Sequence, residues 1–182
     1  VLGVLAQGPR AEGDSAFIIW TLRFPRVLLA IVEGASLGIA GAVMQGLFRN
    51  PMADPFVLGV SSGASLGAVL GMVTGLSGLL GYWSMPIAAF AGAMLTTGAV
   101  YMLSTRKGRT DTWTLLLSGV TVSSLVSSAI AFIMVMFRQR AEEIVFWTMG
   151  GLSRASWSTV LASLPYAIPA TLVLVSQARA LN

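Results

Sequence analysis

The sequence contains no cysteine and no histidine. These absences remove thiolate and imidazole ligands for metals, cysteine nucleophiles and histidine general bases. The sequence therefore argues against a zinc enzyme or a redox enzyme, and we expect no protein-bound metal and no other cofactor. The missing cysteines do not report the redox compartment, because a helical membrane bundle needs no disulfides.

Charged residues are also scarce. They make up 10% of the 182 residues, against about 25% in soluble domains, while apolar residues make up 55%. The 11 basic and 7 acidic side chains are too few for the charged surface of a soluble domain. Together with a mean hydropathy of +0.82, this predicts an integral membrane protein. The basic residues are scattered singly at the ends of apolar runs, so we expect no nucleic-acid interface.

Five apolar runs approach the roughly 20 residues that a helix needs to cross a bilayer. They cover residues 27 to 48, 56 to 75, 82 to 105, 112 to 137 and 157 to 178. They do not alternate as the strands of a membrane barrel would. The expected fold class is therefore all-α, a polytopic transmembrane helix bundle forming one domain over residues 1–182. We also expect residues 1 to 7 to be the remnant of an earlier span, and a short interfacial helix in the connector 138 to 156, ending near Trp157.

The second run carries a glycine at every fourth position: Gly59, Gly63, Gly67, Gly71 and Gly75. On a helix this spacing forms one ridge without side chains, which another backbone can approach closely. In water each glycine would cost about 0.5–1 kcal/mol of helix stability relative to alanine. Because bulky apolar residues fill the positions between them, we expect a tightly packed transmembrane helix and not a flexible linker.

A polar turn with two prolines, Arg49 to Pro55, precedes this run. Each proline disfavours helical geometry in the residue before it, so the chain is expected to reverse here. Asp54 is placed to cap a helix that begins at Pro55, and Asp111 to cap the run that begins near Trp113. A rigid turn of this kind suits a gate or a docking surface, and a simple tight connector is the alternative.

Two arginines flank a proline in Arg23-Phe-Pro-Arg26, where we expect a helix to begin. Their spacing places both on nearly the same face of the first turn. At a helix N-terminus they would oppose the macrodipole by about 0.3–1 kcal/mol each, so a partner should hold them. The residues alone leave two partners open, a protein that offers carboxylates and the phosphates of membrane lipid.

Glu33 is the one acidic residue deep in an apolar run. Facing lipid it would cost at least about 2.5–3.5 kcal/mol, so we expect it to face a cavity, another helix or a water path. It is either a pathway residue, for example a proton site, or a hydrogen-bonded packing residue. Gln45 could bond across a helix interface. Hydroxyls in the run 112 to 137 either wet a pathway or bond backbone carbonyls, and we favour packing; they belong to Ser118, Thr121, Ser123, Ser124, Ser127 and Ser128.

Three motifs in order resemble the FecCD family of ABC importer permeases, which includes cobalamin, haem and ferric-siderophore systems. They are Arg23-Phe-Pro-Arg26, Gly34-Ala-x-Leu-x-x-x-Gly41-Ala-x-Met-Gln45, and Arg49-Asn-Pro-Met-Ala-Asp-Pro-x-x-Leu-Gly-Val-Ser-x-Gly-Ala64. The later part of the chain also resembles the family, in Leu115-Leu-Leu-x-Gly119, Trp147-x-Met-Gly-Gly151, and Trp157 with Pro165.

The resemblance implies an inner-membrane permease that is not itself an enzyme. Its implied partners are a second permease copy in a homodimer, a separate ABC ATPase subunit, and a periplasmic or lipid-anchored substrate-binding protein. The implied cargo is a metal chelate, with ferric siderophore first and cobalamin or haem next. The resemblance further implies that the chain is truncated before the cytoplasmic coupling helices.

The resemblance also implies roles for individual residues. Arg23 and Arg26 match arginines that pair with glutamates of the binding protein. Two cytoplasmic gates are implied, one at Asn50, Pro51 and Met52 and the other at Thr112 and Trp113. The chain departs from the family pattern at Trp113, where the cobalamin permease carries a small residue, and at Glu33, where an apolar residue is usual.

Two other classes of function remain open on the sequence. One is a proton-coupled secondary transporter that uses Glu33 and needs no ATPase. The other is a purely structural membrane subunit, in which reversing the charges of Arg23 and Arg26 would leave partner binding unchanged.

Overall fold

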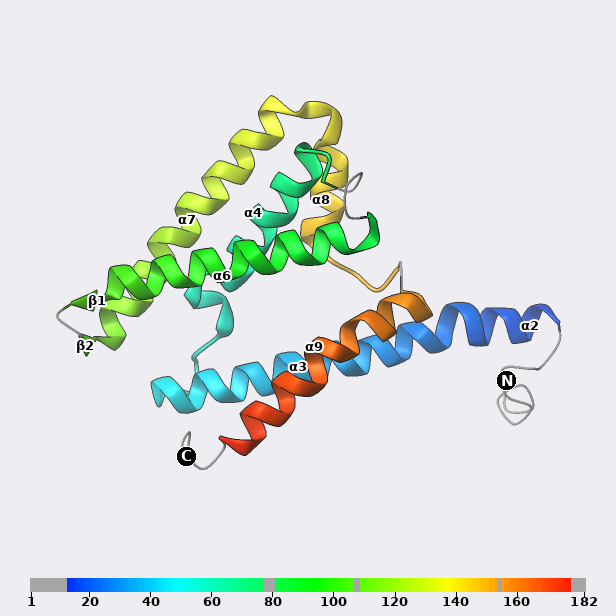
Figure 1. Ribbon diagram of the computed structural model, residues 1–182, viewed down its shortest axis with the longest axis horizontal. Helices are drawn as coiled ribbons and strands as arrows, with labels where there is room; N and C mark the ends of the chain where they lie inside the picture. The colour runs from blue at the N-terminus through cyan, green and yellow to red at the C-terminus, as the bar shows by residue number, and fades with distance from the viewer. Residues whose placement is uncertain (1–12, 77–80, 107–108, 154, 178–182) are drawn as a thin grey trace. The chain divides into compact units, whose positions relative to one another are not determined.

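A computed structural model describes residues 13–76, 81–106, 109–153 and 155–177. Its regular elements are helices apart from one pair of two-residue strands (Figure 1), so the predicted all-α class is confirmed. The chain forms two compact units, one from residues 1–49 and 151–182 and the other from residues 50–150. The expected remnant of a span at residues 1 to 7 lies outside the described residues.

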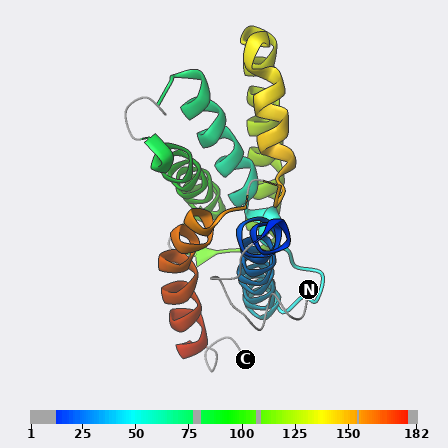
Figure 2. The same cartoon turned by 90° about the vertical axis from the view of Figure 1, so that its right-hand side faces the viewer.

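The first unit consists of one long helical run and a second helix packed against it. The run comprises α2 (Asp14–Phe17), a π-helical stretch η2 (Ile18–Arg23) and α3 (Phe24–Phe48), 35 residues in all. The second helix is α9 (Trp157–Ser176), which lies alongside α3. The view in Figure 2 runs nearly along α3, with α9 to one side of it.

The expectation that a helix begins within Arg23-Phe-Pro-Arg26 is wrong, because the helical run already begins at Asp14. Pro25 is buried inside the run. A proline there lacks an N–H, and its ring crowds the carbonyl of the preceding turn; the π-helical stretch just before it accommodates both effects. Neither arginine lies at a helix N-terminus, so the expected macrodipole penalty does not apply to them.

The second unit is a set of helices joined by short turns. In chain order its elements are η3 (Pro55–Leu58, 3-10), α4 (Val60–Val73), η4 (Gly81–Trp83, 3-10), α6 (Ser84–Ser104), β1 (Thr105–Arg106), β2 (Arg109–Thr110), α7 (Thr112–Met136), η5 (Arg138–Arg140, 3-10) and α8 (Ala141–Met149). The strands pair antiparallel with Thr105 opposite Thr110. A small apolar core joins α4 to α8 through Val69, Met72 and Ile144.

Four helical runs in the described chain are long and apolar enough to cross a membrane: Asp14–Phe48, Ser84–Ser104, Thr112–Met136 and Trp157–Ser176. In the remaining expected span, 56 to 75, the α-helix is only the 14-residue α4, which follows the 3-10 helix η3. At 1.5 Å per residue this helix is about 21 Å long, less than the roughly 30 Å of hydrocarbon. Gly59 and Gly75 adopt positive φ angles of 76° and 73° and bound the helix at its two ends.

The connector 138 to 156 contains the expected short helix, α8, but this helix ends at Met149 and not near Trp157. Gly150 and Gly151 follow it with φ angles of 68° and 139°, values that glycine adopts readily and other residues do not. Residues 151–153 and 155 lie outside helices and strands. The Ser156 hydroxyl accepts a hydrogen bond from the N–H of Thr159 and caps α9.

Candidate functional site

The two arginines of the Arg23-Phe-Pro-Arg26 motif have different surroundings. Arg26 donates hydrogen bonds from Nε to the carbonyl oxygen of Leu152 at 3.1 Å and from Nη2 to that of Ser153 at 3.4 Å. Arg23 is exposed and makes no hydrogen bond or ion pair with the residues that the structure describes. Among the described residues, only the guanidinium of Arg26 therefore has a hydrogen-bond partner.

The first residue of α9, Trp157, contacts the helical run close to these arginines. The indole Nε1 of Trp157 donates to the carbonyl oxygen of Trp20 at 2.9 Å. The Phe24 ring lies between the two indoles, with centroid distances of 4.8 Å to Trp20 and 5.8 Å to Trp157. We call this set of contacts, together with those of Arg26, the clasp; it comprises Trp20, Phe24, Arg26, Leu152, Ser153 and Trp157.

Pro25 explains why the clasp forms at this turn. In the π-helical stretch the N–H of Phe24 donates to the carbonyl of Ile19, five residues earlier. The same register would pair the next residue, Pro25, with the carbonyl of Trp20, but proline has no N–H to donate. The indole N–H of Trp157 takes that place. Because Pro25 has no N–H, the Trp20 carbonyl accepts a hydrogen bond from the Trp157 side chain of α9.

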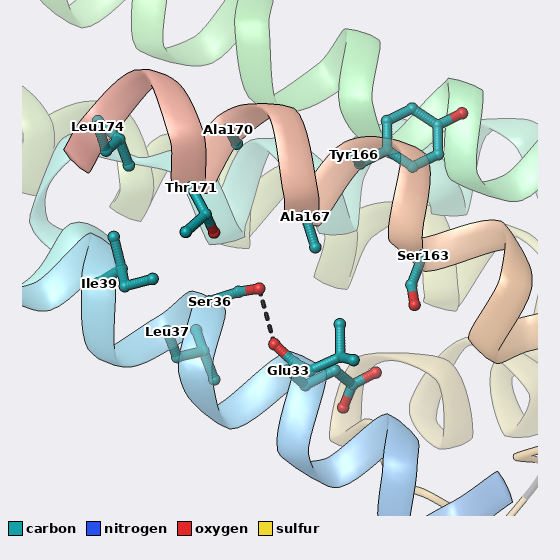
Figure 3. Close-up of a pocket in the computed structure, with 11 residues that line it drawn as sticks. Glu33, Ser36, Leu37, Ile39, Ser163, Tyr166, Ala167, Ala170, Thr171 and Leu174 are labelled. Atoms are coloured by element: carbon teal, nitrogen blue, oxygen red, sulfur yellow. Dashed lines mark hydrogen bonds between the residues drawn. The ribbon is translucent and has the colours of Figure 1, made fainter. Parts of the chain in front are cut away.

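Glu33 lines a groove between α3 and α9 (Figure 3). The cavity has a volume of about 540 Å³, and most of its lining is apolar. The carboxylate of Glu33 is exposed and makes no hydrogen bond or ion pair with the described residues. The hydrogen bond drawn in Figure 3 joins the Ser36 hydroxyl to the carbonyl oxygen of Val32, at 2.7 Å. Gln45 is exposed on α3, and its side chain makes no hydrogen bond within the described part of the chain.

The turn at residues 50 to 54 is held by its own side chains. Asn50 Oδ1 accepts a hydrogen bond from the N–H of Met52 at 2.9 Å, and the Asn50 carbonyl accepts one from the N–H of Ala53. Asp54 caps η3 as predicted, accepting from the N–H of Phe56 at 2.7 Å. Pro51 and Met52 at the tip are exposed, Met52 to 85%. A rigid turn therefore presents a methionine outward.

The start of α7 is built in the same way. Asp111 Oδ2 accepts hydrogen bonds from the N–H and the hydroxyl of Thr114, both at 3.0 Å, and caps the helix as predicted. Thr112 is the first residue of α7, and the Trp113 side chain is 75% exposed. The two candidate gate segments belong to one unit. The helix η3, which follows the first segment, packs directly against α7, which carries the second.

Glycines set how closely the helices of the second unit approach. A Cβ on Gly119 of α7 would overlap the carbonyl oxygen of Val57 in η3. Between α4 and α6, a Cβ on Gly63 would overlap Thr96 and the Gly92 carbonyl, and one on Gly67 would overlap the Ala88 carbonyl. A Cβ on Gly71 would lie 3.2 Å from the Cβ of Ala88. The expected ridge therefore faces α6 at these three positions, whereas Gly59 and Gly75 lie outside α4.

Hydroxyl groups line a second cavity, between α4, α7 and α8, with a volume of about 430 Å³. Its lining contains no charged residue and consists of Phe56, Ser61, Ser62, Ser65, Ser123, Ser127, Ile130 and Thr148. Ser62 bonds Ser123 at 3.2 Å. The hydroxyls of Ser61, Ser65 and Ser127 make no hydrogen bond to the residues described.

The hydroxyl-bearing residues of α7 fall into two groups, which correspond to the packing and pathway roles that the sequence left open. Thr121, Ser124 and Ser128 donate to backbone carbonyls four residues earlier, which is the packing use. Ser123 and Ser127 line the cavity. The contributions of Ser61 and Ser65 from α4 were missed, although their spacing of four places them on one helical face. Such a pattern of hydroxyls can bind a ligand that accepts hydrogen bonds.

Comparison with known proteins gives a consistent result. The model of the FecCD transport family matches residues 3–182. A cobalamin import system permease protein, BtuC, of Halobacterium salinarum is 43% identical over 165 residues, covering 91% of this chain and 44% of its own. A hemin transport system permease protein, HmuU, of Yersinia pestis is 39% identical over 176 residues, covering 94% of this chain and 52% of its own.

A solved structure assigned to the metal-chelate type of ABC transporter, in an inward-facing conformation, resembles the fold with a TM-score of 0.83 and 26% identity. The match covers 96% of this chain and 55% of that one. The chain spans about half the length of the curated relatives it matches.

Proposed function

The chain belongs to the FecCD transport family, and on that basis we propose that it serves as the permease subunit of an ABC importer for a metal chelate. The observation that carries the proposal is the family match over residues 3–182. It agrees with the helices long enough to cross a bilayer, and the chain is a multi-pass protein of the inner membrane.

The permease performs no chemistry in this proposal. A separate ATPase subunit hydrolyses ATP, and a substrate-binding protein delivers the cargo to the outer face. Two permease copies form the pathway between them, and ATP-driven closure of the ATPases exchanges an outward-open for an inward-open state. The support for these partners is the family itself and its relatives, the cobalamin and hemin permeases of transport systems.

We assign the parts of the chain as follows. Arg23 and Arg26 belong to the surface that meets the binding protein, because they are basic side chains exposed at one turn. The cytoplasmic gates are Asn50, Pro51 and Met52 in one segment and Thr112 and Trp113 in the other. Both segments combine a rigid, side-chain-capped backbone with an exposed large side chain, which suits a surface that closes and opens as a unit.

Ferric siderophore is the first cargo that we propose, with cobalamin and haem next. The support is the hydroxyl-lined cavity, which offers several hydrogen-bond donors and no charged side chain to an oxygen-rich ligand. A chain without histidine or cysteine offers neither imidazole nor thiolate ligands with which to take the metal from its chelator, so the metal passes already chelated.

The comparisons give no support to a proton-coupled carrier that uses Glu33, since the named relatives are permeases of import systems. Glu33 lines the apolar groove between α3 and α9, which agrees with the expectation that this carboxylate faces a cavity.

The proposal is tested by the ATPase activity of the assembled complex. The permease is reconstituted in nanodiscs with its cognate ATPase and binding protein, and ATP hydrolysis is measured with the binding protein empty or loaded with ferric siderophore, cobalamin or haem. We expect hydrolysis to rise when the loaded binding protein is added, most with its true cargo. A permease that neither copurifies with the ATPase nor changes its rate would contradict the proposal.

A further inference from the structure

We infer that the ring of Phe56 decides how large a chelate the hydroxyl-lined cavity of the second unit can take. The ring stands in the wall between that cavity and an adjoining one, and it separates the two. Removing the ring joins them into one larger site. The assignment of the cavity to the cargo rests on the proposed function, whereas the place and the effect of the ring concern only the chain itself.

The first argument is the wall that the two cavities share. The adjoining cavity has a volume of about 570 Å³, and the hydroxyl-lined cavity one of about 430 Å³. The lining of the adjoining cavity consists of Phe56, Val57, Val120, Ser123, Ser124 and Ser127. Phe56, Ser123 and Ser127 line both cavities and therefore form their common wall. Because serine is short, the phenyl ring is the bulky member of this wall.

The second argument is that the backbone of Phe56 is fixed. Its N–H donates to Asp54 Oδ1 at 2.7 Å, and its carbonyl accepts a hydrogen bond from the N–H of Gly59 at 3.1 Å. The carbonyl of the next residue, Val57, lies against Gly119 of α7, where a Cβ would overlap it. Moving Phe56 away from α7 would therefore break these contacts.

The third argument is the register of α7. Gly119, Ser123 and Ser127 are spaced by four residues and lie on one face of the helix. The backbone of η3 packs at the glycine, and the two hydroxyls of the wall follow on the next two turns. Phe56 is 58% exposed, so its ring is not part of the packed core. An exposed ring on a fixed backbone can set the width of a site without being needed for folding.

The contacts that this site offers indicate the class of ligand. Ser61, Ser65 and Ser127 carry hydroxyls without a partner among the described residues, and these suit the oxygen atoms of a chelator. The Phe56 ring adds a flat apolar surface. With the ring in place, the site has the volume of the hydroxyl-lined cavity, about 430 Å³, toward the lower end of the roughly 300–1,000 Å³ of ligand sites. The cargo is therefore a compact, oxygen-rich chelate.

The effect of the ring is tested without a partner or a cargo. The sequence has no cysteine, so Ser123→Cys gives the permease a single thiol in the common wall. The rates at which this thiol reacts with a small methanethiosulfonate and with a bulky dye maleimide are measured in nanodiscs. The backgrounds are the parent, Phe56→Ala, Phe56→Trp and Phe132→Ala. Phe132 is the matched control, because it is a 66% exposed ring on α7 that lines neither cavity.

We expect Phe56→Ala to raise the rate of the bulky reagent several-fold and to leave that of the small reagent nearly unchanged. Phe56→Trp should slow the bulky reagent, and Phe132→Ala should change neither rate. The tryptophan variant keeps an aromatic ring in place, so it tests the wall even if the alanine variant folds poorly. Equal rates for the bulky reagent in all backgrounds, or the same rise in Phe132→Ala, would overturn the role of the ring.

The size limit on the cargo is tested by protection of the same thiol. The permease is assembled with its cognate ATPase, and the small reagent is applied in the presence of excess ferric siderophore, the same siderophore carrying a bulky dye, or cobalamin. We expect the plain siderophore to protect the thiol in the parent and in Phe56→Ala. The two larger compounds should protect it only in Phe56→Ala. The same protecting compounds with and without the ring would overturn the size limit.

Failure of this inference can be told apart from failure of the proposed function. If no compound protects the thiol while the loaded binding protein still stimulates ATP hydrolysis, the permease function stands and the cavity is not its cargo site. If hydrolysis is not stimulated either, the proposed function fails as well. In both cases the rates of the bulky reagent still decide whether the ring of Phe56 separates the two cavities.

Discussion

Gly67 offers the sharpest test of how the second unit is packed. A Cβ at this position would overlap the carbonyl oxygen of Ala88, and it would lie 2.9 Å from the Ala88 carbonyl carbon and 3.1 Å from the Gly92 Cα. All three atoms belong to the backbone of α6, so no side-chain rotation can relieve the clash. In Gly67→Ala the helices α4 and α6 must therefore move apart.

The magnitude follows from two opposing terms. Overpacking a close contact lowers the free energy of unfolding by about 1–3 kcal/mol, whereas replacing glycine by alanine within a helix raises it by about 0.5–1 kcal/mol. The variant should therefore be destabilised by up to about 2.5 kcal/mol, which in a chain of this size lowers the melting temperature by up to about 10 °C. Gly98 on α6 is the matched control, because a Cβ there meets no atom within 4 Å in the described structure. Gly98→Ala should be neutral or slightly stabilising.

The assay is thermal unfolding of both variants in the same detergent, followed by far-ultraviolet circular dichroism. Both substitutions add one methyl group to a glycine within a helix, so composition alone predicts equal effects. The packing predicts opposite signs. Equal melting temperatures for Gly67→Ala and Gly98→Ala would refute the close approach of α4 and α6.

Three further predictions follow from hydrogen bonds and cavities. Asp111→Ala should lower stability by about 0.5–2 kcal/mol through loss of the α7 cap, while Asp111→Asn should retain most of it, and chemical unfolding of the two would show this. Trp157→Phe keeps a ring against Phe24 but removes the indole donor, so it should cost about 0.5–1.5 kcal/mol; an unfolding curve identical to that of the parent would contradict the clasp. The triple change Ser61→Ala, Ser65→Ala and Ser127→Ala should raise the KM for chelate uptake several-fold, whereas Ser124→Ala, whose hydroxyl bonds the Val120 carbonyl, should not.

Features encoded within a few residues could be predicted from the sequence. The apolar runs give α3, α6, α7 and α9, because length and hydropathy are local properties. The caps at Asp54 and Asp111 need only a carboxylate placed before a helix. The family resemblance was also carried by short ordered motifs, and the comparisons confirm it.

Features that depend on a distant partner could not be predicted. Arg26 binds carbonyls 126 and 127 residues away, and a backbone acceptor leaves no mark in the sequence. The helix start was misplaced because a proline usually marks a boundary, whereas here a π-helical stretch and the Trp157 indole satisfy the turn around Pro25. The short length of α4 could not be predicted either. Glycine adopts helical and positive φ angles alike, so the sequence does not show that Gly59 and Gly75 end the helix.

Uptake into proteoliposomes tests the central claim most directly. Vesicles carrying the permease and its ATPase, with ATP inside and the loaded binding protein outside, should accumulate ferric siderophore, and this should stop when a non-hydrolysable nucleotide replaces ATP. Uptake that needs no ATPase, follows an imposed pH gradient and is lost in Glu33→Gln would contradict the account.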